Sequence, residues 1–402
     1  MNAVYDHIIA ILVVGAIFVG TVVVMPTMSL INLQAVDQQQ LRNTALNVFN
    51  TMLLDTGLGS DGVRWSADWG SIDPFDTNNP PVERFGLASA QDSTFYVLDP
   101  DKVQRLVKGN PIGEINYTTV KELLGLQGYG FSLRIIPPFN VTNVDGTKID
   151  EIHSPIDETA LSQEKLQYAV KVSYLDGRPI PNATIQATAV YTDRQNFAIT
   201  PPHITTTTAV GICSDTIPLK FEPYHIIVIL RVSVADVATI VVTFGKIPVK
   251  VIDINMVGDT VILTRPKDKP SAEVKLNSVY FLESGSTLNS LYNGTQTGSD
   301  KDHFNTGDSP HRCWNKTFSG LKYCDPVILI FNIETVPPDA QQGEKGNQEI
   351  AVAGPYQNLL GHTVFDYGGS PKRSSSAVRI QRSVIISGMT YTAELWLWKE
   401  SP

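Results

Sequence analysis

The sequence predicts a mainly β protein that begins with a long α-helix, and three observations support this expectation. A run without charged residues extends from Ile8 to Met25, and a helical apolar pattern follows it as far as Leu53. Downstream, apolar and polar residues alternate in many short segments separated by Gly, Pro, Asn and Asp. We therefore expect a transmembrane and amphipathic helix, a small α+β unit, a β-sandwich and a β-rich C-terminal domain, in that order.

The composition bounds the size and the class of the protein. The chain has 402 residues, of which 42% are hydrophobic and 18% charged, so it is long and apolar enough for two or three cores of ordinary size. Its formal net charge is -9. Because binding to phosphates requires a basic face, this charge argues against a nucleic-acid partner.

The uncharged run predicts a helix that spans a membrane once. At 1.5 Å per residue it extends roughly 27 Å, close to the thickness of a bilayer core. A cleaved secretory signal is the alternative, but no Lys or Arg precedes the run and VVVMPTMS is a poor cleavage site. Ala16 and Gly20 form a small-xxx-small pair that permits close contact between helices. We assign Ile8, Ile11, Gly15, Ala16 and Gly20 to this membrane and assembly segment.

An amphipathic segment follows the uncharged run. Its apolar positions recur at helical spacing, and its opposite face is polar. The stripe either packs on the chain's own downstream domains or assembles laterally with identical rods, and in the second case it belongs to the assembly surface. The apolar positions are Leu41, Ala45, Val48, Phe49 and Met52, and the polar ones are Asp37, Gln38, Gln40, Arg42 and Asn43.

The rest of the chain divides into three further intervals. Asp99 before Pro100 is typical of a helix start, and Thr118 is expected to cap a second helix. These helices belong to the α+β unit. The expected intervals are 1–58 for the two helical segments, 59–162 for the α+β module, 163–246 for the sandwich and 247–402 for the β-rich C-terminal domain.

The sandwich has the clearest strand pattern. Apolar residues alternate from Leu166 to Tyr174, Asp176-Gly177 favours a turn, and a second alternating strand leads to Tyr191. At the end of the chain, a run from Val378 to Ile386 and the strand after Ser387-Gly388 predict a terminal hairpin that closes a sheet.

Several features favour a location outside the cell for everything after the membrane segment. Cys313 and Cys324 flank a short loop that one disulfide could close, which leaves Cys213 free and buried. Five sequons end in Thr, somewhat more than chance gives in a chain this rich in Asn and Thr. The candidate glycosylation sites are Asn116, Asn140, Asn182, Asn293 and Asn315.

The sequence carries no recognised catalytic motif. It lacks a phosphate-binding loop, H-E-x-x-H, C-x-x-C and G-x-S-x-G. The nearest candidate for a functional site is one loop rich in Asp and His. Its carboxylates could bind Ca²⁺ and its imidazoles could bind a transition metal, although the spacing matches no EF-hand. These residues are Asp300, Asp302, His303, Asp308 and His311. We expect no enzyme, no cofactor and no metal site.

Several stretches resemble two known families. DGRPIPNATIQATAVY, from Asp176 to Tyr191, resembles the start of Ig-like, carboxypeptidase-regulatory-like domains, which are mostly structural spacers. MNAVYDHIIAILVVGAIFVGTVVV, VDQQQLRNTALNVFNTMLLDTG, VLDPDKVQRLV and VKELLGLQGYGFSLRI together resemble archaeal pilin-like surface proteins. That resemblance implies the type IV pilin arrangement, in which an apolar N-terminal helix continues into an amphipathic extension and a β-rich head.

Two functions from different classes follow. The first is a membrane-rooted extracellular structural protein, a pilin-like surface or filament subunit that assembles through its N-terminal helix. The second is a single-pass anchored adhesion protein whose β-domain loops bind a glycan or another surface ligand. An envelope enzyme or a transporter subunit is a weaker third alternative.

Overall fold

The structure is a computed structural model of the chain. It describes residues 2–59, 82–90, 96–107, 114–149, 153–193, 195–235, 237–246, 253–264, 273–282, 288–293, 303–304, 313–319, 328–336, 347–353, 365–371 and 376–400. These residues form a mainly β structure with several separate sheets, which confirms the coarse fold class.

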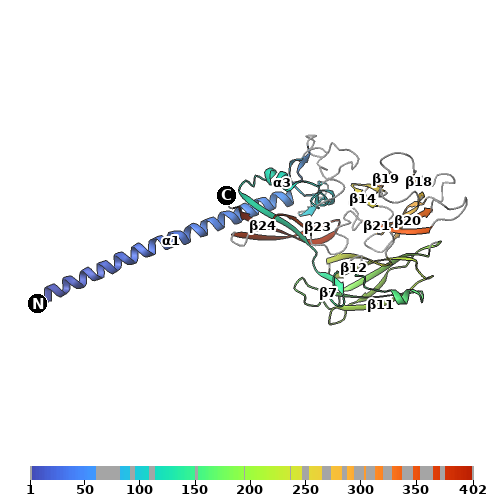
Figure 1. The fold of residues 1–402 in the computed structure, drawn as a ribbon, viewed down its shortest axis with the longest axis horizontal. Helices are drawn as coiled ribbons and strands as arrows, with labels where there is room; N and C mark the ends of the chain where they lie inside the picture. Colours follow the sequence, from blue (N-terminus) through green and yellow to red (C-terminus); the bar gives the residue numbers. More distant parts are fainter. Residues whose placement is uncertain are drawn as a thin grey trace.

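Helix α1 (Asn2–Leu54) leads away from the β part of the molecule, with the N-terminus at its far end (Figure 1). Side chains of α1 are described for residues 9–19 and from residue 36 onward. Among the residues described in this way, no helix is both long enough and apolar enough to cross a membrane.

The C-terminal half of α1 packs on a five-stranded sheet, and together they form the part that we call the head. Strand order is β22-β4-β24-β23-β3, with all pairs antiparallel except β23 with β3. The strands are β3 (Val97–Leu98), β4 (Tyr129–Ile136), β22 (Phe365–Gly368), β23 (Ala377–Ile386) and β24 (Met389–Lys399). The terminal hairpin β23–β24 forms as the sequence predicts, but its strands are inner strands of the sheet, with β22 and β3 at the edges.

Two short helices and a small two-stranded sheet complete the head. Asp99 caps α2 by accepting from the backbone N–H of Asp101 at 3.0 Å, as predicted. The second cap differs from the prediction, because Asn116 caps α3 and accepts from the N–H of Thr118 at 2.8 Å. The elements are β1 (Leu58–Gly59), β2 (Val82–Arg84), α2 (Pro100–Gln104) and α3 (Tyr117–Leu123).

The first sandwich consists of two sheets around one core. Strands β11, β7, β5 and β6 form one sheet, and β10, β8, β12, β13 and β9 form the other. The elements are β5 (Asn140–Asn143), β6 (Ile156–Asp157), α4 (Glu158–Leu161), β7 (Lys165–Ser173), β8 (Thr184–Thr192), β9 (Phe197–Ile199), β10 (His203–Thr206), β11 (Ile212–Pro218), β12 (His225–Val234) and β13 (Val237–Lys246).

The strands on either side of Asp176-Gly177 do not pair with each other. The turn forms, since the N–H of Gly177 donates to the carbonyl of Tyr174 at 2.9 Å. However, β7 pairs with β5, β6 and β11, whereas β8 pairs with β9, β10 and β12. The turn therefore carries the chain from one sheet of the sandwich to the other, because both strands bury apolar side chains in the core between the sheets.

A second sandwich follows, again with two sheets around one core. Its sheets have the orders β14-β15-β19 and β17-β16-β20-β21, with β18 paired to β16. The strands are β14 (Asp253–Val257), β15 (Thr260–Thr264), β16 (Glu273–Leu282), β17 (Leu288–Asn293), β18 (His303–Phe304), β19 (Cys313–Thr317), β20 (Ile328–Val336) and β21 (Asn347–Ala353).

Both sandwiches are inserted into the head. The chain leaves the head sheet after β4, forms the sandwiches and returns to pair β22 with β4. The head sheet thus takes strands from two of the expected intervals, 59–162 and 247–402. The expected boundary after residue 246 would separate β3 and β4 from the three other strands of this sheet. The first sandwich also includes β5 and β6, which precede the expected start at residue 163.

The outer faces of the sandwiches pack together with the head core. On β12, Ile226, Val228 and Leu230 lie inside the first sandwich, whereas Ile227 and Ile229 join the cluster that includes the head. Because both faces of β12 are buried from Ile226 to Leu230, this stretch is continuously apolar instead of alternating. The other sandwich residues in the head cluster are Val190, Ile240, Leu282, Ile328, Ile330 and Ile350.

Candidate functional site

Helix α1 is the candidate functional site, and its C-terminal half is anchored in the head. Leu41 is 2% exposed, Val48 is 7% exposed, and Ala45, Phe49 and Met52 are fully buried. They pack with the head sheet in one apolar cluster. This corrects their assignment to the assembly surface. The helix is amphipathic because its apolar stripe covers the chain's own sheet. These five side chains are therefore not available to another copy.

Backbone contacts fix the C-terminal end of α1. The N–H of Leu87 donates to the carbonyl of Met52 at 2.8 Å, and the N–H of Ala88 donates to the carbonyl of Asp55 at 3.0 Å. A Cβ on Gly86 would lie 2.1 Å from the carbonyl oxygen of Asp55, so only glycine permits this close approach. The helix therefore meets the head at a defined position.

Polar contacts add to this anchoring at the surface. The carboxylate of Asp55 lies 3.1 Å from the guanidinium of Arg84, and that of Asp37 lies 3.1 Å from the ammonium group of Lys399. All the expected polar-face residues are exposed: Asp37, Gln38, Gln40, Arg42 and Asn43. This half of the helix thus shows the solvent a polar surface.

The N-terminal half of α1 has the opposite character. Residues 9–19 are exposed, and their large apolar side chains show between 52% and 67% of their surface. Ile11, Gly15 and Ala16 lie on this segment and are exposed, and a Cβ on Gly15 would meet no atom within 4 Å. For Ile8 and Gly20 the structure describes only the backbone, which is helical. The large apolar side chains are Ile9, Ile11, Leu12, Val13, Val14, Ile17, Phe18 and Val19.

The predicted sequons occupy different environments. Asn116 and Asn182 are exposed, and Asn182 has a φ of 57° in the loop before β8. Asn140 is half-buried in β5, where it pairs with Ser173. The side chains of Asn293 and Asn315 lie outside the described residues.

The predicted disulfide and metal loop fall mostly outside the described residues. Cys324 lies there, as does the side chain of Cys313, whose backbone belongs to β19. Of the loop Asp300, Asp302, His303, Asp308 and His311, the structure describes only the backbone of His303 in β18. Cys213 is buried and unpaired among the described residues, as predicted. Within this part of the chain, His, Cys, Asp and Glu form no group of three suited to a metal ion.

Sequence analysis did not identify one functional group, a buried carboxylate on the head sheet. The Glu394 side chain is 1% exposed on β24 and accepts hydrogen bonds from Arg379 Nε at 2.8 Å, from Gln381 Nε2 at 2.7 Å and from the indole N–H of Trp396. Burial alone would raise the pKa of Glu394, but these hydrogen bonds outweigh burial and hold the pKa below its ordinary value. The alternation of residues along β24 predicts that Glu394 and Trp396 share one face of the sheet. It does not predict that Arg379 and Gln381 of β23 lie beside Glu394.

Comparisons with known proteins identify no family. No family model matches the chain, and no curated protein matches it. A trypsin-activated α-2-macroglobulin from Escherichia coli matches 55% of this chain and 18% of its own, with 13% identity and a TM-score of 0.17. A Salmonella α-2-macroglobulin mutant matches 55% of this chain and 16% of its own, with 12% identity and a TM-score of 0.18. Likenesses this weak carry no argument about fold or function.

Proposed function

We propose that the protein is a membrane-rooted extracellular structural subunit of pilin-like architecture, which assembles through the N-terminal half of α1. One observation carries this proposal: a single helix changes from exposed and apolar over residues 9–19 to buried in the head from Leu41 onward. The head holds one half rigidly and thereby presents the other half. The sequence resemblance to archaeal pilin-like proteins agrees with this arrangement.

The physical reason for assembly is the free energy of the exposed apolar side chains. Removing one large apolar side chain from water contributes about 1.5–3 kcal/mol. A contiguous apolar surface of this kind marks a protein or membrane contact. A bilayer covers it before assembly, and neighbouring copies of the same helix cover it afterwards. Gly15 and Ala16 leave room for such neighbours, because small residues let helix backbones approach closely.

The experiment compares Val14→Asp with Gln39→Asp in the full chain, purified from membranes in mild detergent. Val14 is 66% exposed on the apolar half, and Gln39 is exposed on the polar half. Electron microscopy and sedimentation should show large assemblies for the wild type and for Gln39→Asp. Val14→Asp should lose them without a change in melting temperature, because its charge would be buried between helices but lies outside the head.

Two outcomes separate this proposal from its alternative. Assemblies that persist in Val14→Asp would refute assembly through this segment. A wild type that stays in the membrane fraction and never assembles would favour the second candidate, a single-pass anchored adhesion protein that binds a glycan or surface ligand. That candidate is supported by an open pocket between the two sandwiches.

A further inference from the structure

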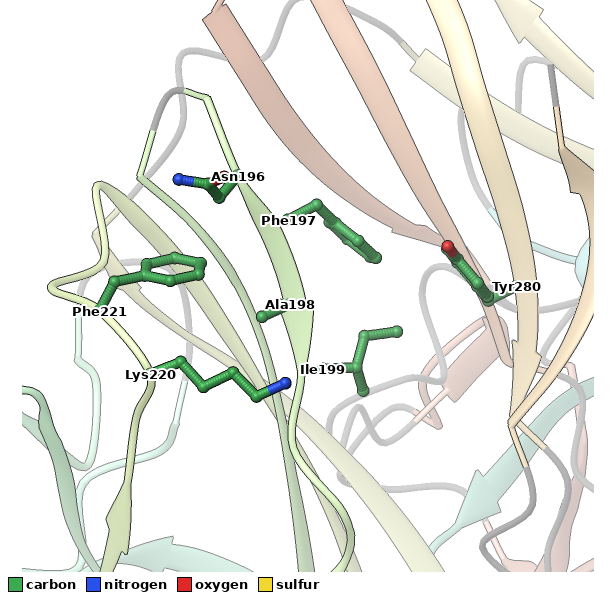
Figure 2. Close-up of a pocket in the computed structure, with 7 residues that line it drawn as sticks. All are labelled: Asn196, Phe197, Ala198, Ile199, Lys220, Phe221 and Tyr280. Atoms are coloured by element: carbon green, nitrogen blue, oxygen red, sulfur yellow. The ribbon is translucent and has the colours of Figure 1, made fainter. Parts of the chain in front are cut away.

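A pocket of about 590 Å³ lies at the junction of the two sandwiches, between β9 and β16. Figure 2 shows the residues that line it. Its volume falls within the range of small-molecule sites, and such sites are frequent where two folded units meet. The lining residues are Asn196, Phe197, Ala198, Ile199, Lys220, Phe221 and Tyr280.

One wall of the pocket is aromatic. The rings of Phe197 and Tyr280 stack with their centroids 5.4 Å apart and an angle of 11° between their planes. Both residues are half-buried, pack against the apolar cluster that includes the head, and line the pocket with the part that is left accessible. Because Phe197 belongs to the first sandwich and Tyr280 to the second, this wall exists only when the two sandwiches are docked.

The opposite side carries a cation. Lys220 is exposed, and its ammonium group extends toward the β9 backbone near Ala198 and Ile199 (Figure 2). Its own backbone N–H donates to the hydroxyl of Tyr191 at 2.8 Å, which fixes the position of the residue. Figure 2 shows Lys220 on one side of β9 and the pair Phe197 and Tyr280 on the other, so the pocket offers a positive charge and an aromatic wall with β9 between them.

Backbone groups of β9 add hydrogen-bonding capacity. The N–H of Asp193 donates to the carbonyl of Asn196 at 3.2 Å, and the N–H of Thr200 donates to the carbonyl of Ala189 at 2.9 Å. In an antiparallel pair the backbone groups of alternate residues face the partner strand. Those of Phe197 and Ile199 therefore face away from β8, the strand with which β9 pairs among the described residues.

We propose that this pocket binds a pyranose sugar that carries a carboxylate, such as a hexuronic acid unit of a polysaccharide. The apolar face of the sugar ring would pack on the free side of the stacked Phe197–Tyr280 pair, its hydroxyls would bond to the outward backbone groups of β9, and its carboxylate would reach past β9 to Lys220. A neutral sugar lacks the charge, and a simple carboxylate lacks the apolar face. This inference stands apart from the assembly function, because the pocket contains no residue of α1.

Titration calorimetry on the full chain, with methyl glucuronide, methyl glucoside and acetate as probes, tests the proposal. Methyl glucuronide should bind, and the other two should bind at least about tenfold more weakly, because a charged hydrogen bond contributes that much affinity. Lys220→Met should weaken glucuronide binding by a similar factor. The matched control Lys165→Met, which alters an exposed lysine on β7, should leave it unchanged.

Each contrary result is decisive. No glucuronide binding at millimolar concentration, or equal binding of glucuronide and glucoside, would overturn the proposal. Equal binding of acetate would reduce the pocket to a simple anion site, which also overturns it. Phe197→Leu keeps an apolar residue on β9 and removes the ring, and unchanged affinity in that variant would rule out the aromatic wall.

Discussion

The carboxylate of Asp101 accepts a hydrogen bond from the backbone N–H of Gly258 at 2.8 Å and thereby joins the head to the second sandwich. Asp101 lies on α2, and Gly258 occupies the turn between β14 and β15 with a φ of 57°. The neighbouring Gln104 donates to the carbonyl of Met256 at 3.1 Å. This polar contact complements the shared apolar cluster, so the orientation of the sandwich on the head is specified by directional bonds.

Asp101→Ala should weaken this docking. Asp101 is 2% exposed and also accepts from Gln104 at 2.9 Å, so its removal leaves two donors without this acceptor. We expect a loss of about 1–3 kcal/mol in the free energy of unfolding. Hydrogen exchange should report faster exchange of the Gly258 amide. The control Glu222→Ala alters an exposed residue and should leave both quantities unchanged; equal exchange rates in all three proteins would refute the linking role.

Phe49→Ala tests the anchoring of α1 in the head. Phe49 is fully buried in the head cluster, and truncating such a ring typically costs about 3–5 kcal/mol. Denaturant unfolding followed by tryptophan fluorescence should show this loss. Asn50→Ala, one residue further along and exposed, should stay within about 0.5 kcal/mol of the wild type. Similar stabilities for the two variants would mean that the stripe is not anchored in the head.

Glu394 should make the stability of the head depend on pH. Because its pKa in the folded state lies below the ordinary value of 4.5, its stabilising effect is present above that value and disappears as the pH falls through the lowered pKa. Glu394→Gln should lower the free energy of unfolding at neutral pH by about 1–3 kcal/mol. Urea unfolding between about pH 7 and pH 3 should then show a flatter pH dependence than the wild type.

The control for that measurement is Glu83→Gln, which changes an exposed carboxylate on β2. It should reproduce the pH profile of the wild type. A steep acid profile that survives in Glu394→Gln would place the titrating group elsewhere in the molecule.

The sequons should differ in occupancy if the β domains are exported to a compartment with N-glycosylation. Asn182 is exposed in a loop with a φ of 57°, whereas Asn140 is half-buried and pairs with Ser173 inside a sheet. Mass spectrometry of peptides from the native protein should therefore find a glycan on Asn182 and none on Asn140. The reverse pattern would show that modification precedes folding of the first sandwich and that the folded environment does not select the site.

The sequence pattern predicted those elements well that depend on a few neighbouring residues, such as a hairpin turn or a helix cap. The terminal hairpin formed around Ser387-Gly388, and Asp99 capped a helix, because turn and cap chemistry act over a few residues. The pattern did not predict the partners. Asp176-Gly177 makes a turn between β7 and β8, yet these strands belong to opposite sheets, since alternation shows which face is buried and not which strand lies alongside.

The same distinction applies to the candidate sites. Phe197 and Tyr280 stack in the structure but are far apart in the sequence, and no sequence pattern around either residue predicts this contact. The apolar stripe from Leu41 to Met52 was visible, but helical spacing is the same whether the stripe covers the chain's own sheet or a second copy.

By itself the sequence determined a long apolar N-terminal segment, a β-rich remainder and the buried face of most strands, because these follow from hydrophobic periodicity and turn residues. Only the tertiary structure decided that both sandwiches are inserted into the head, that the stripe of α1 is buried there, and that residues 9–19 are left exposed. The physical reason is that hydrophobic periodicity shows which face of an element is buried, whereas long-range packing determines which surface covers that face.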